Sequence, residues 1–373
     1  MITERYIGIN KNIYACYIDY SKAFDKIHHD KLMESLLKIN VDGKNIRLIS
    51  NLYWEQMAAI RINNENTEYT EIKRGVRHGC VLSPSLFNLC TEMIFREIED
   101  MKGVTIGGVN INNLRYADDT VLLAESEKDL QDILEVVKEK SNLYGLTMNV
   151  KKTKAMAFSK EETPPKVNLQ FDGDTIEQVD GYIYLGQRMT SDGRCEAEVK
   201  RRIEIARSTF INMRDLLTAR KLDFSIRLRL VNCYIWSTLL YGAETWTLTK
   251  SLEKKISAFE MWIYRRMMRI SWTRKKTNAE VLRMAGLQGI AVMGIIKGRK
   301  ITYFGHIKRH NSLLKELLEG KAEGRRAVGY PRTNWEGNVE TWCGRKLSWC
   351  TVWCRDRGAW RKVALNLRTG EET

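Results

Sequence analysis

Apolar residues follow two different patterns in the first half of the chain. Residues 13–18 are rich in β-branched and aromatic side chains, which predicts a buried strand that delivers Asp19 at its end. Helices are predicted where apolar residues recur three and four positions apart, at residues 29–38, 44–54, 84–99 and 127–144. Further strands are predicted at residues 58–62 and 155–159 and in a hairpin around residues 182–186. This mixture predicts an α+β fold, in which helices back one face of a sheet.

Two adjacent aspartates, Asp118 and Asp119, stand between two short apolar runs. Residues 114–117 and 120–124 predict two strands joined by a tight turn, with the acidic pair at the bend. Neighbouring carboxylates repel each other unless a cation lies between them. A solvated Asp-Asp turn is the simpler interpretation of an isolated pair, so the surrounding motifs decide between the two.

From Glu196 onward the pattern becomes largely helical. Long helices rich in Lys and Arg are predicted at residues 199–217, 224–240 and 251–270. Aromatic residues interleaved at helical spacing are expected to pack the core of a bundle. The chain beyond Gly298 is basic and irregular. Three domains are therefore expected, at residues 1–195, 196–297 and 298–373.

Charge is distributed unevenly between the two halves. Residues 1–195 hold 25 Lys and Arg against 29 Asp and Glu, whereas residues 196–373 hold 36 against 17, so the net charge changes from −4 to +19. This asymmetry favours a polyanionic partner bound mainly by the second half. A merely solvated basic surface is the alternative.

Composition narrows the class of protein. The 373 residues are 43% hydrophobic, begin without an apolar signal segment, and have their longest apolar neighbourhood at residues 231–241, too short and too polar to span a bilayer. The eight scattered cysteines are expected to be reduced thiols. An intracellular protein of the nucleus or cytoplasm, without a membrane partner, is therefore expected.

Five motifs follow one another along the chain. They are IDYSKAFD at residues 18–25, RHGCVLSP at 77–84, YADD at 116–119, GLTMN with KKTK at 145–154, and YLG at 184–186. In this order and at this spacing they resemble the core motifs of reverse transcriptases, especially those of LINE-type, non-LTR retrotransposons. The similarity continues through LLYGAETW at residues 239–246 and Gly305-His306. Any one motif is weak, but five in order are specific.

The resemblance implies a right-hand polymerase palm, an antiparallel sheet backed by helices, followed by a mainly α-helical thumb and a basic C-terminal region. It also implies an RNA-directed DNA polymerase that uses Mg²⁺, or Mn²⁺. The expected partners are an RNA template, a DNA primer and deoxynucleoside triphosphates. Oligomeric state and template preference have no signature in the sequence.

The resemblance assigns roles to individual residues. The catalytic metal ligands would be Asp19, Asp118 and Asp119. The nucleotide-binding residues would be Tyr20, Phe24, His78, Gly79 and Lys152, with Phe24 under the sugar, where a bulky ring excludes a ribose 2′-hydroxyl. The primer grip would be Tyr184, Leu185 and Gly186. One lysine among Lys151, Lys152 and Lys154 would protonate the leaving pyrophosphate, and the sequence does not choose between them.

Two departures from the family pattern bear on activity. His78 and Val81 stand where the family usually has Gln and Pro. Only 18 residues precede Asp19, so we expect the fingers, with their triphosphate-binding cations, to be missing and synthesis to be weak or absent. A non-catalytic nucleic-acid-binding remnant is the main alternative. A third interpretation is an unrelated metal-dependent hydrolase. It would require the Asp pair to occur without the other motifs in their order along the chain.

Cysteines and tryptophans recur near the C-terminus. Cys343, Cys350 and Cys354 suggest zinc, but they lack a fourth ligand, so zinc is not expected. The tryptophans of this region are expected to pack a small basic cap; they are Trp342, Trp349, Trp353 and Trp360.

Overall fold

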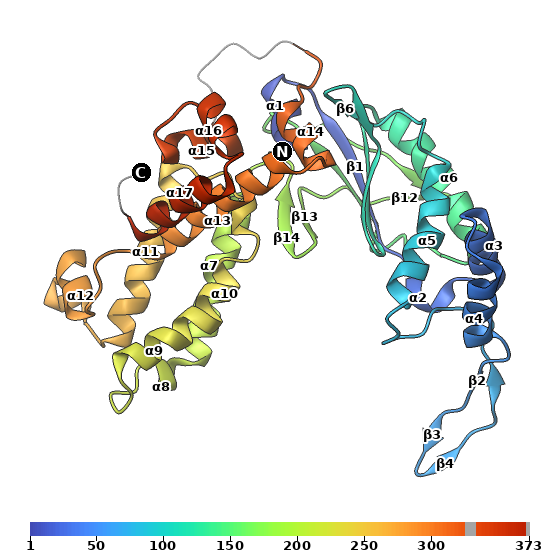
Figure 1. Ribbon diagram of the computed structural model, residues 1–373, viewed down its shortest axis with the longest axis horizontal. Coiled ribbons are helices and arrows are strands. Elements are labelled where there is room, and N and C mark those ends of the chain that lie inside the picture. Colours follow the sequence, from blue (N-terminus) through green and yellow to red (C-terminus); the bar gives the residue numbers. More distant parts are fainter. Residues whose placement is uncertain (325–332, 371–373) are drawn as a thin grey trace. The chain divides into compact units, whose positions relative to one another are not determined.

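The structure is a computed structural model that describes residues 1–324 and 333–370 (Figure 1). The chain forms two compact units, Ile9–Leu185 on the one hand and Met1–Gly8 with Gly186–Thr373 on the other. We call them the sheet unit and the helical unit. The chain passes from one unit to the other twice, between Gly8 and Ile9 and between Leu185 and Gly186. The three domains expected from the sequence stay a prediction.

The sheet unit is organised around a four-stranded antiparallel sheet in the order β10-β1-β9-β8. The strands are β1 (Ile13–Ile18), β8 (Asn113–Tyr116), β9 (Asp119–Ala124) and β10 (Lys154–Phe158). The central strand β1 is nearly all buried, as its apolar sequence predicts. It pairs with β9 from Tyr14 opposite Ala124 to Ile18 opposite Thr120.

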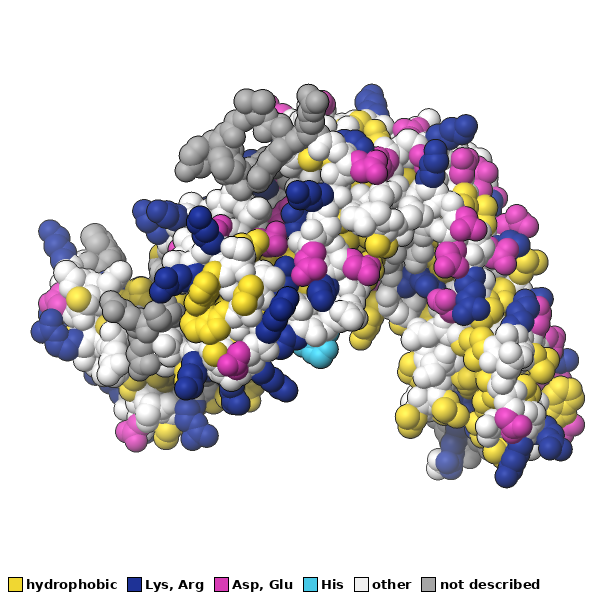
Figure 2. All heavy atoms as spheres, turned by 45° about the horizontal axis from the view of Figure 1, so that its top comes forward, with side chains coloured by type: hydrophobic (Ala, Val, Ile, Leu, Met, Phe, Trp, Pro, Cys, Tyr) yellow, Lys and Arg dark blue, Asp and Glu magenta, His cyan; other side chains and the backbone are white. Residues whose placement is uncertain are grey.

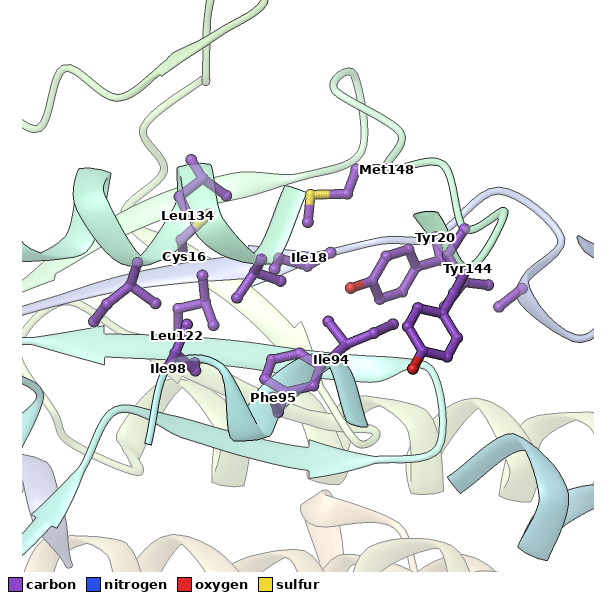
Figure 3. Close-up of a cluster of buried hydrophobic side chains, with 14 of the residues drawn as sticks. Cys16, Ile18, Tyr20, Ile94, Phe95, Ile98, Leu122, Leu134, Tyr144 and Met148 are labelled. Atoms are coloured by element: carbon purple, nitrogen blue, oxygen red, sulfur yellow. The ribbon is translucent and has the colours of Figure 1, made fainter. Parts of the chain in front are cut away.

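Helices cover one face of this sheet. The longer ones are α3 (His29–Lys38), α4 (Gly43–Tyr53), α5 (Ser83–Arg96) and α6 (Glu127–Leu143). Helix α6 packs on β1 and β9, α5 packs on α6, and α3 packs on α5. Figure 3 shows the resulting core, in which Cys16 and Leu122 of the strands lie near Leu134 of α6. The predicted α+β fold class is therefore confirmed.

The sequence missed an exposed hairpin. Residues 58–62, expected as one strand, divide between β2 (Met57–Ala58) and β3 (Arg61–Ile62). Strand β2 pairs with β5 (Thr70–Glu71), and β3 pairs with β4 (Glu65–Asn66). The chain reverses at Asn63 and Asn64, which have φ of 50° and 71°. Two consecutive residues with positive φ form the tight turn that a hairpin needs.

Short elements complete the sheet unit. They are α2 (Ala23–Lys26), β6 (Val104–Ile106), β7 (Val109–Ile111), β11 (Gln170–Phe171), β12 (Asp174–Thr175) and β13 (Gly181–Tyr184).

The helical unit contains β14 (Gln187–Thr190) and otherwise helices. Its helices before the C-terminal region are α1 (Ile2–Gly8), α7 (Glu196–Asn212), α8 (Arg214–Leu217), α9 (Phe224–Leu230), α10 (Ser237–Leu239), α11 (Lys250–Met267) and α12 (Asn278–Met284). Then follow α13 (Val292–Arg309), α14 (Leu313–Glu319), α15 (Trp335–Cys343), α16 (Leu347–Trp353) and α17 (Arg357–Thr369). The short 3₁₀ turns are Ala243–Thr245 and Trp272–Arg274. No helix in the described ranges is long and apolar enough to cross a bilayer.

Two of the predicted long helices are interrupted. The helix expected at residues 199–217 breaks at Met213, between α7 and α8. The helix expected at 224–240 contains a π-helical segment, Val231–Trp236, between α9 and α10. A π-segment has a wider turn, which a pattern of apolar residues does not reveal.

Candidate active site

Asp19, Asp118 and Asp119 lie at the same end of two neighbouring strands. Asp19 follows the last residue of β1, and Asp119 is the first residue of β9. Ile18 pairs with Thr120, so the backbones of Asp19 and Asp119 are brought side by side. Asp118 lies in the turn before β9, where Ala117 has a φ of 54°. The expected strand end and turn are observed, and the catalytic role of these residues stays a prediction.

The three carboxylates influence one another. Burial raises the pKa of Asp119, and the negative charges of Asp118 and Asp19 raise it further. The Oδ2 atom of Asp19 is buried without a hydrogen-bond donor. The Nζ atom of Lys152 lies 3.7 Å from it, which is ion-pair distance and longer than a hydrogen bond. Because a buried, unsatisfied oxygen is costly, this arrangement favours a cation beside Asp19.

The structure distinguishes between the lysines that follow. The Lys154 ammonium donates to Glu177 at 2.7 Å and also to the carbonyl oxygen of Lys151, and the Lys154 side chain is only 19% exposed. The Lys152 side chain is 68% exposed and lies beside Asp19. Of these two lysines, Lys152 is therefore favoured by position and accessibility for the proton-donating role expected from the sequence.

Three tyrosines border the acidic group, and two of them were not singled out from the sequence. The ring of Tyr17 stacks on Tyr182 at 4.3 Å and contacts Tyr184 at 5.6 Å between ring centroids. The Tyr184 hydroxyl donates to the carbonyl oxygen of Asp119. Burial, together with the charge of Asp119, raises the pKa of Tyr184 to about 12, so the phenol stays a neutral donor. Side chains two residues apart on a strand point to the same face. The alternation of Tyr182 and Tyr184 in the sequence could therefore have indicated that both rings contact the same neighbour.

Two of the residues expected to bind the nucleotide, Phe24 and His78, lie next to each other in the sheet unit. Phe24 stacks on Phe87 with ring centroids 4.2 Å apart, and His78 lies next to Phe24 at 6.3 Å. The Nε2 atom of His78 is 2.8 Å from Oδ1 of Asp25, and both side chains are exposed. The Phe24 ring is thus fixed on one side, and His78 is oriented by an acidic neighbour.

Gly79 and Tyr20 differ in accessibility. Gly79 is exposed, has a φ of 80°, and would meet no atom within 4 Å with an added Cβ. The Tyr20 ring is buried, and its hydroxyl hydrogen-bonds the Ser141 hydroxyl at 2.9 Å. Any nucleotide contact of Tyr20 would therefore have to use its main chain.

Comparison with known proteins addresses the family of this chain. The family model described as "Reverse transcriptase (RNA-dependent DNA polymerase)" matches residues 5–189. A transposon-derived protein of Caenorhabditis elegans is 30% identical over 212 residues, which cover 55% of this chain and 74% of the worm protein. The Pol polyprotein of the type-2 retrotransposable element R2DM of Drosophila melanogaster is 26% identical over 196 residues. The chain belongs to the reverse transcriptases of non-LTR retrotransposons.

This reverse transcriptase spans only part of the length of several relatives that it matches. The match to the Drosophila polyprotein covers 50% of this chain but only 18% of the polyprotein. Among solved structures, telomerase from Candida tropicalis in complex with a fragment of telomeric RNA aligns over 85% of this chain and 50% of the telomerase chain. That alignment has a TM-score of 0.38 and 13% identity, which is too low to support an argument about function.

The acidic group of this reverse transcriptase fits a divalent cation. Mg²⁺ prefers oxygen ligands and is usually bound by one or two carboxylates together with water and substrate phosphates. Asp19 and Asp118, with Asp119 beside them, supply such oxygens, and a cation would relieve the repulsion that Asp118 and Asp19 exert on Asp119. Among the residues described, no three His, Cys, Asp or Glu side chains group as metal ligands. Water and substrate oxygens would complete the coordination.

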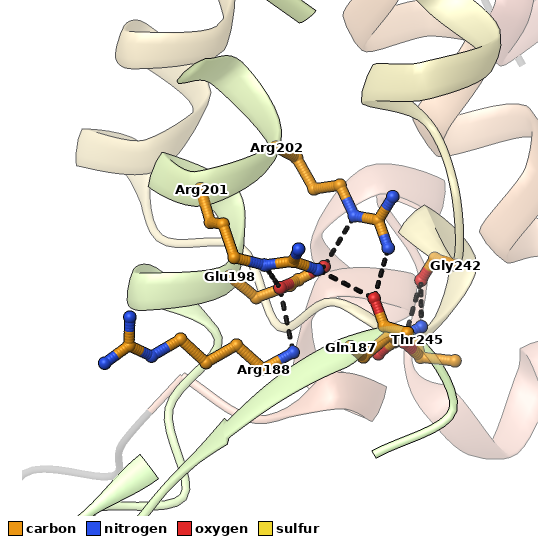
Figure 4. Close-up of polar contacts among 8 residues, drawn as sticks. Gln187, Arg188, Glu198, Arg201, Arg202, Gly242 and Thr245 are labelled. Carbon is orange, nitrogen blue, oxygen red and sulfur yellow. Dashed lines mark hydrogen bonds and ion pairs between the residues drawn. The ribbon is translucent and has the colours of Figure 1, made fainter. Parts of the chain in front are cut away.

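The predicted primer grip is a turn with unusual backbone geometry. Leu185 and Gly186 have φ of 48° and 73°. Within the helical unit, the carbonyl oxygen of Gly186 accepts hydrogen bonds from Arg201, at 2.7 Å, and from Arg202. Both guanidinium groups are oriented by the buried carboxylate of Glu198 (Figure 4). Two helix-borne arginines thus fix the Gly186 carbonyl, a contact that the sequence did not predict.

The C-terminal cysteines lie in the core of the last helices. Cys343, Cys350 and Cys354 are buried free thiols. The Cys343 thiol donates a hydrogen bond to Cys350, and this bond, together with burial, raises the pKa of Cys343. Their side chains therefore pack as small apolar groups next to Trp335 and Trp360.

Proposed function

We propose that this chain catalyses RNA-templated DNA synthesis at the group formed by Asp19, Asp118 and Asp119. The substrates would be deoxynucleoside triphosphates, and the partners would be an RNA template and a DNA primer. The observation that supports the proposal most directly is the buried, donor-free Oδ2 atom of Asp19 beside two further carboxylates. Family membership supports the same reaction.

The side chains divide the work as follows. Asp19 and Asp118, assisted by Asp119, would hold Mg²⁺ or Mn²⁺, which neutralises phosphate charge and activates the primer hydroxyl. Lys152 is within reach of the same site and would donate the proton that the leaving pyrophosphate needs. Phe24, supported by Phe87, would limit the space for a 2′-hydroxyl.

Replacement of Asp118 tests the proposal. The Asp118→Ala change removes a cation ligand, so we expect Mg²⁺-dependent extension of a DNA primer on an RNA template to fall by at least about 10²-fold. Asp174→Ala is the matched control, because Asp174 is exposed on β12 of the same unit. The measurement is single-nucleotide extension with the purified chain.

The same assay addresses the expectation of weak synthesis. Extension by residues 1–373 would be compared with extension by a version lengthened upstream. Equal loss in both aspartate variants would contradict the assigned site. Absence of extension in every version, with primer–template binding intact, would favour the alternative, a nucleic-acid-binding protein without catalysis, which the basic second half supports.

A further inference from the structure

Helices α16 and α17 present an aromatic surface that the polymerase reaction does not use. Trp349 and Val352 of α16 are 37% and 64% exposed, and Leu365 of α17 is 55% exposed. The Trp349 and Trp353 rings touch, with centroids 3.9 Å apart and an interplanar angle of 62°. We call Trp349, Val352, Trp353 and Leu365 the tryptophan patch. Its rings are partly open to solvent, whereas Trp360 is fully buried in the core beneath.

Positive charge surrounds the tryptophan patch. Residues 344–369 contain seven basic residues, and Asp356 is their only acidic residue. The basic residues are Arg345, Lys346, Arg355, Arg357, Arg361, Lys362 and Arg368. Asp356 is engaged locally, because its side chain accepts the amide hydrogens of Gly358 and Ala359 at the start of α17. Figure 2 shows, left of centre, a group of hydrophobic side chains with Lys and Arg, and a few Asp or Glu, beside it.

Cations and rings are combined at close range. The Arg345 guanidinium lies 5.4 Å from the centre of the Trp349 ring. Trp353 lines an open hollow of about 480 Å³ together with Asp356 and with Lys362 and Asn366 of α17. A flat ring, a nearby ammonium and an amide therefore face the same space. Residues of α17 line one side of the hollow, and the same helix also carries Arg357, Arg361 and Arg368.

These features match the chemistry of a single-stranded nucleic acid. Unpaired bases stack on aromatic side chains regardless of sequence, while Lys and Arg neutralise the backbone phosphates. A duplex buries its bases against one another and offers only phosphates to such a surface. The exposed rings therefore favour a single strand over a duplex.

We propose that the tryptophan patch, with Arg345 and Lys362, binds single-stranded RNA. The choice of RNA rests on the proposed function, in which the unpaired strand is the RNA template. The patch contains none of the carboxylates proposed to hold the cation, so the contribution we propose for it is retention of template and not chemistry.

The test measures binding of a fluorescent oligouridine to the full chain, with excess unlabelled DNA duplex occupying duplex-binding surfaces. Stacking of a base on a tryptophan accounts for about 5- to 150-fold in affinity, so Trp349→Ala should weaken binding within that range. Trp349→Phe keeps a ring and should retain most of the affinity. Trp54→Ala, at an exposed tryptophan of the sheet unit, should leave it unchanged.

A second variant, which changes a charge, keeps the proposal testable if the Trp349→Ala variant does not fold. Lys362→Gln removes one phosphate contact and should lower the salt slope by about 0.7; Lys128→Gln, exposed on α6, is its control. Unchanged oligouridine binding by folded Trp349→Ala and Lys362→Gln would overturn the proposal. Loss of binding to phosphatidylserine vesicles with RNA affinity intact would overturn it in favour of a membrane surface, and tighter binding of oligothymidine than of oligouridine would overturn the choice of RNA.

Failure of the proposed function gives a different result. If the unsubstituted chain extends no primer, but Trp349→Ala still weakens oligouridine binding, the polymerase proposal is contradicted and the binding-site proposal is supported. If the Trp349→Ala and Lys362→Gln variants extend primers and bind RNA as well as the unsubstituted chain does, the polymerase proposal is supported and the binding-site proposal is contradicted.

Discussion

Lys300, near the middle of α13, is a fully buried lysine. Its ammonium donates to the carbonyl oxygen of Trp246 at 2.8 Å and to Oδ1 of Asn338 at 2.9 Å. The rings of Trp335 and Trp342 lie 4.8 and 5.3 Å away. Burial lowers the pKa of Lys300 to about 7, because removal from water disfavours the charged form.

This lowered pKa predicts a pH dependence of stability. Above pH 7 the folded chain releases the Lys300 proton, whereas the unfolded chain keeps it until the ordinary lysine pKa of 10.5. The unfolded state then binds more protons, so this group makes the free energy of unfolding rise with pH between about 7 and 10. Lys300→Met should flatten that rise in urea titrations. The matched Lys297→Met variant should keep it, and an identical pH profile for Lys300→Met would contradict the assignment.

Residue types that define the chemistry were predictable from the sequence, but their contacts were not. Asp19, Asp118 and Asp119 were identified because strand ends and turns have local patterns. The choice of Lys152 over Lys154 depends on Glu177, which lies 23 residues further along the chain and pairs with Lys154. Such a contact has no local pattern, so the three lysines could not be separated.

At the scale of elements, α7 and the turn at Gly186 form one polar network within the helical unit. The Glu198 carboxylate accepts from Arg201 and Arg202 and from the Arg188 amide. Burial raises the pKa of Glu198, but these hydrogen bonds outweigh burial and leave it lowered. The carboxylate is thus ionised and fully engaged at neutral pH.

Removal of this carboxylate should be costly. Glu198→Ala leaves two arginines near a buried position without their anion, and breaking such a buried pair costs about 3–5 kcal/mol of unfolding free energy. Glu204→Ala, on the same helix but exposed and 3.8 Å from Arg207, should cost no more than about 1 kcal/mol. Because a lowered carboxyl pKa stabilises only above that pKa, the gap between the variants should narrow as the pH falls below about 4. Equal losses in urea denaturation would show that the network contributes little.

Elements with strong periodicity were predicted almost to the residue. The helix expected at 29–38 is α3, and the helix expected at 127–144 is α6, where Ser126 caps the first turn by accepting the Asp129 amide. The hairpin at Asn63 and Asn64 and the π-segment at 231–236 were missed. Both depend on backbone geometry at a few residues and do not change the spacing of apolar positions.

At the scale of the molecule, charge and secondary structure divide the chain at nearly the same place. The sheet unit ends at Leu185, and the excess of Lys and Arg begins beyond residue 195. The sequence predicted this change, because long helical patterns rich in Lys and Arg begin there. The inclusion of residues 1–8 in the helical unit was not foreseen, because it rests on contacts such as Arg5 with Glu336.

The net charge of +19 beyond residue 195 predicts salt-dependent binding of a primer–template duplex by the whole chain. Each phosphate neutralised contributes about 0.9 to the slope of log affinity against log salt, so six contacts would reduce affinity about 10³-fold between 50 and 200 mM. A triple glutamine variant at exposed Lys221, Arg229 and Lys254 of the helical unit should lower that slope by at least about 0.9. The control triple is Lys44, Lys102 and Lys128 of the sheet unit, also exposed. A nearly flat salt dependence, or equal effects of the two triples in anisotropy titrations, would mean that the basic half is only a solvated surface.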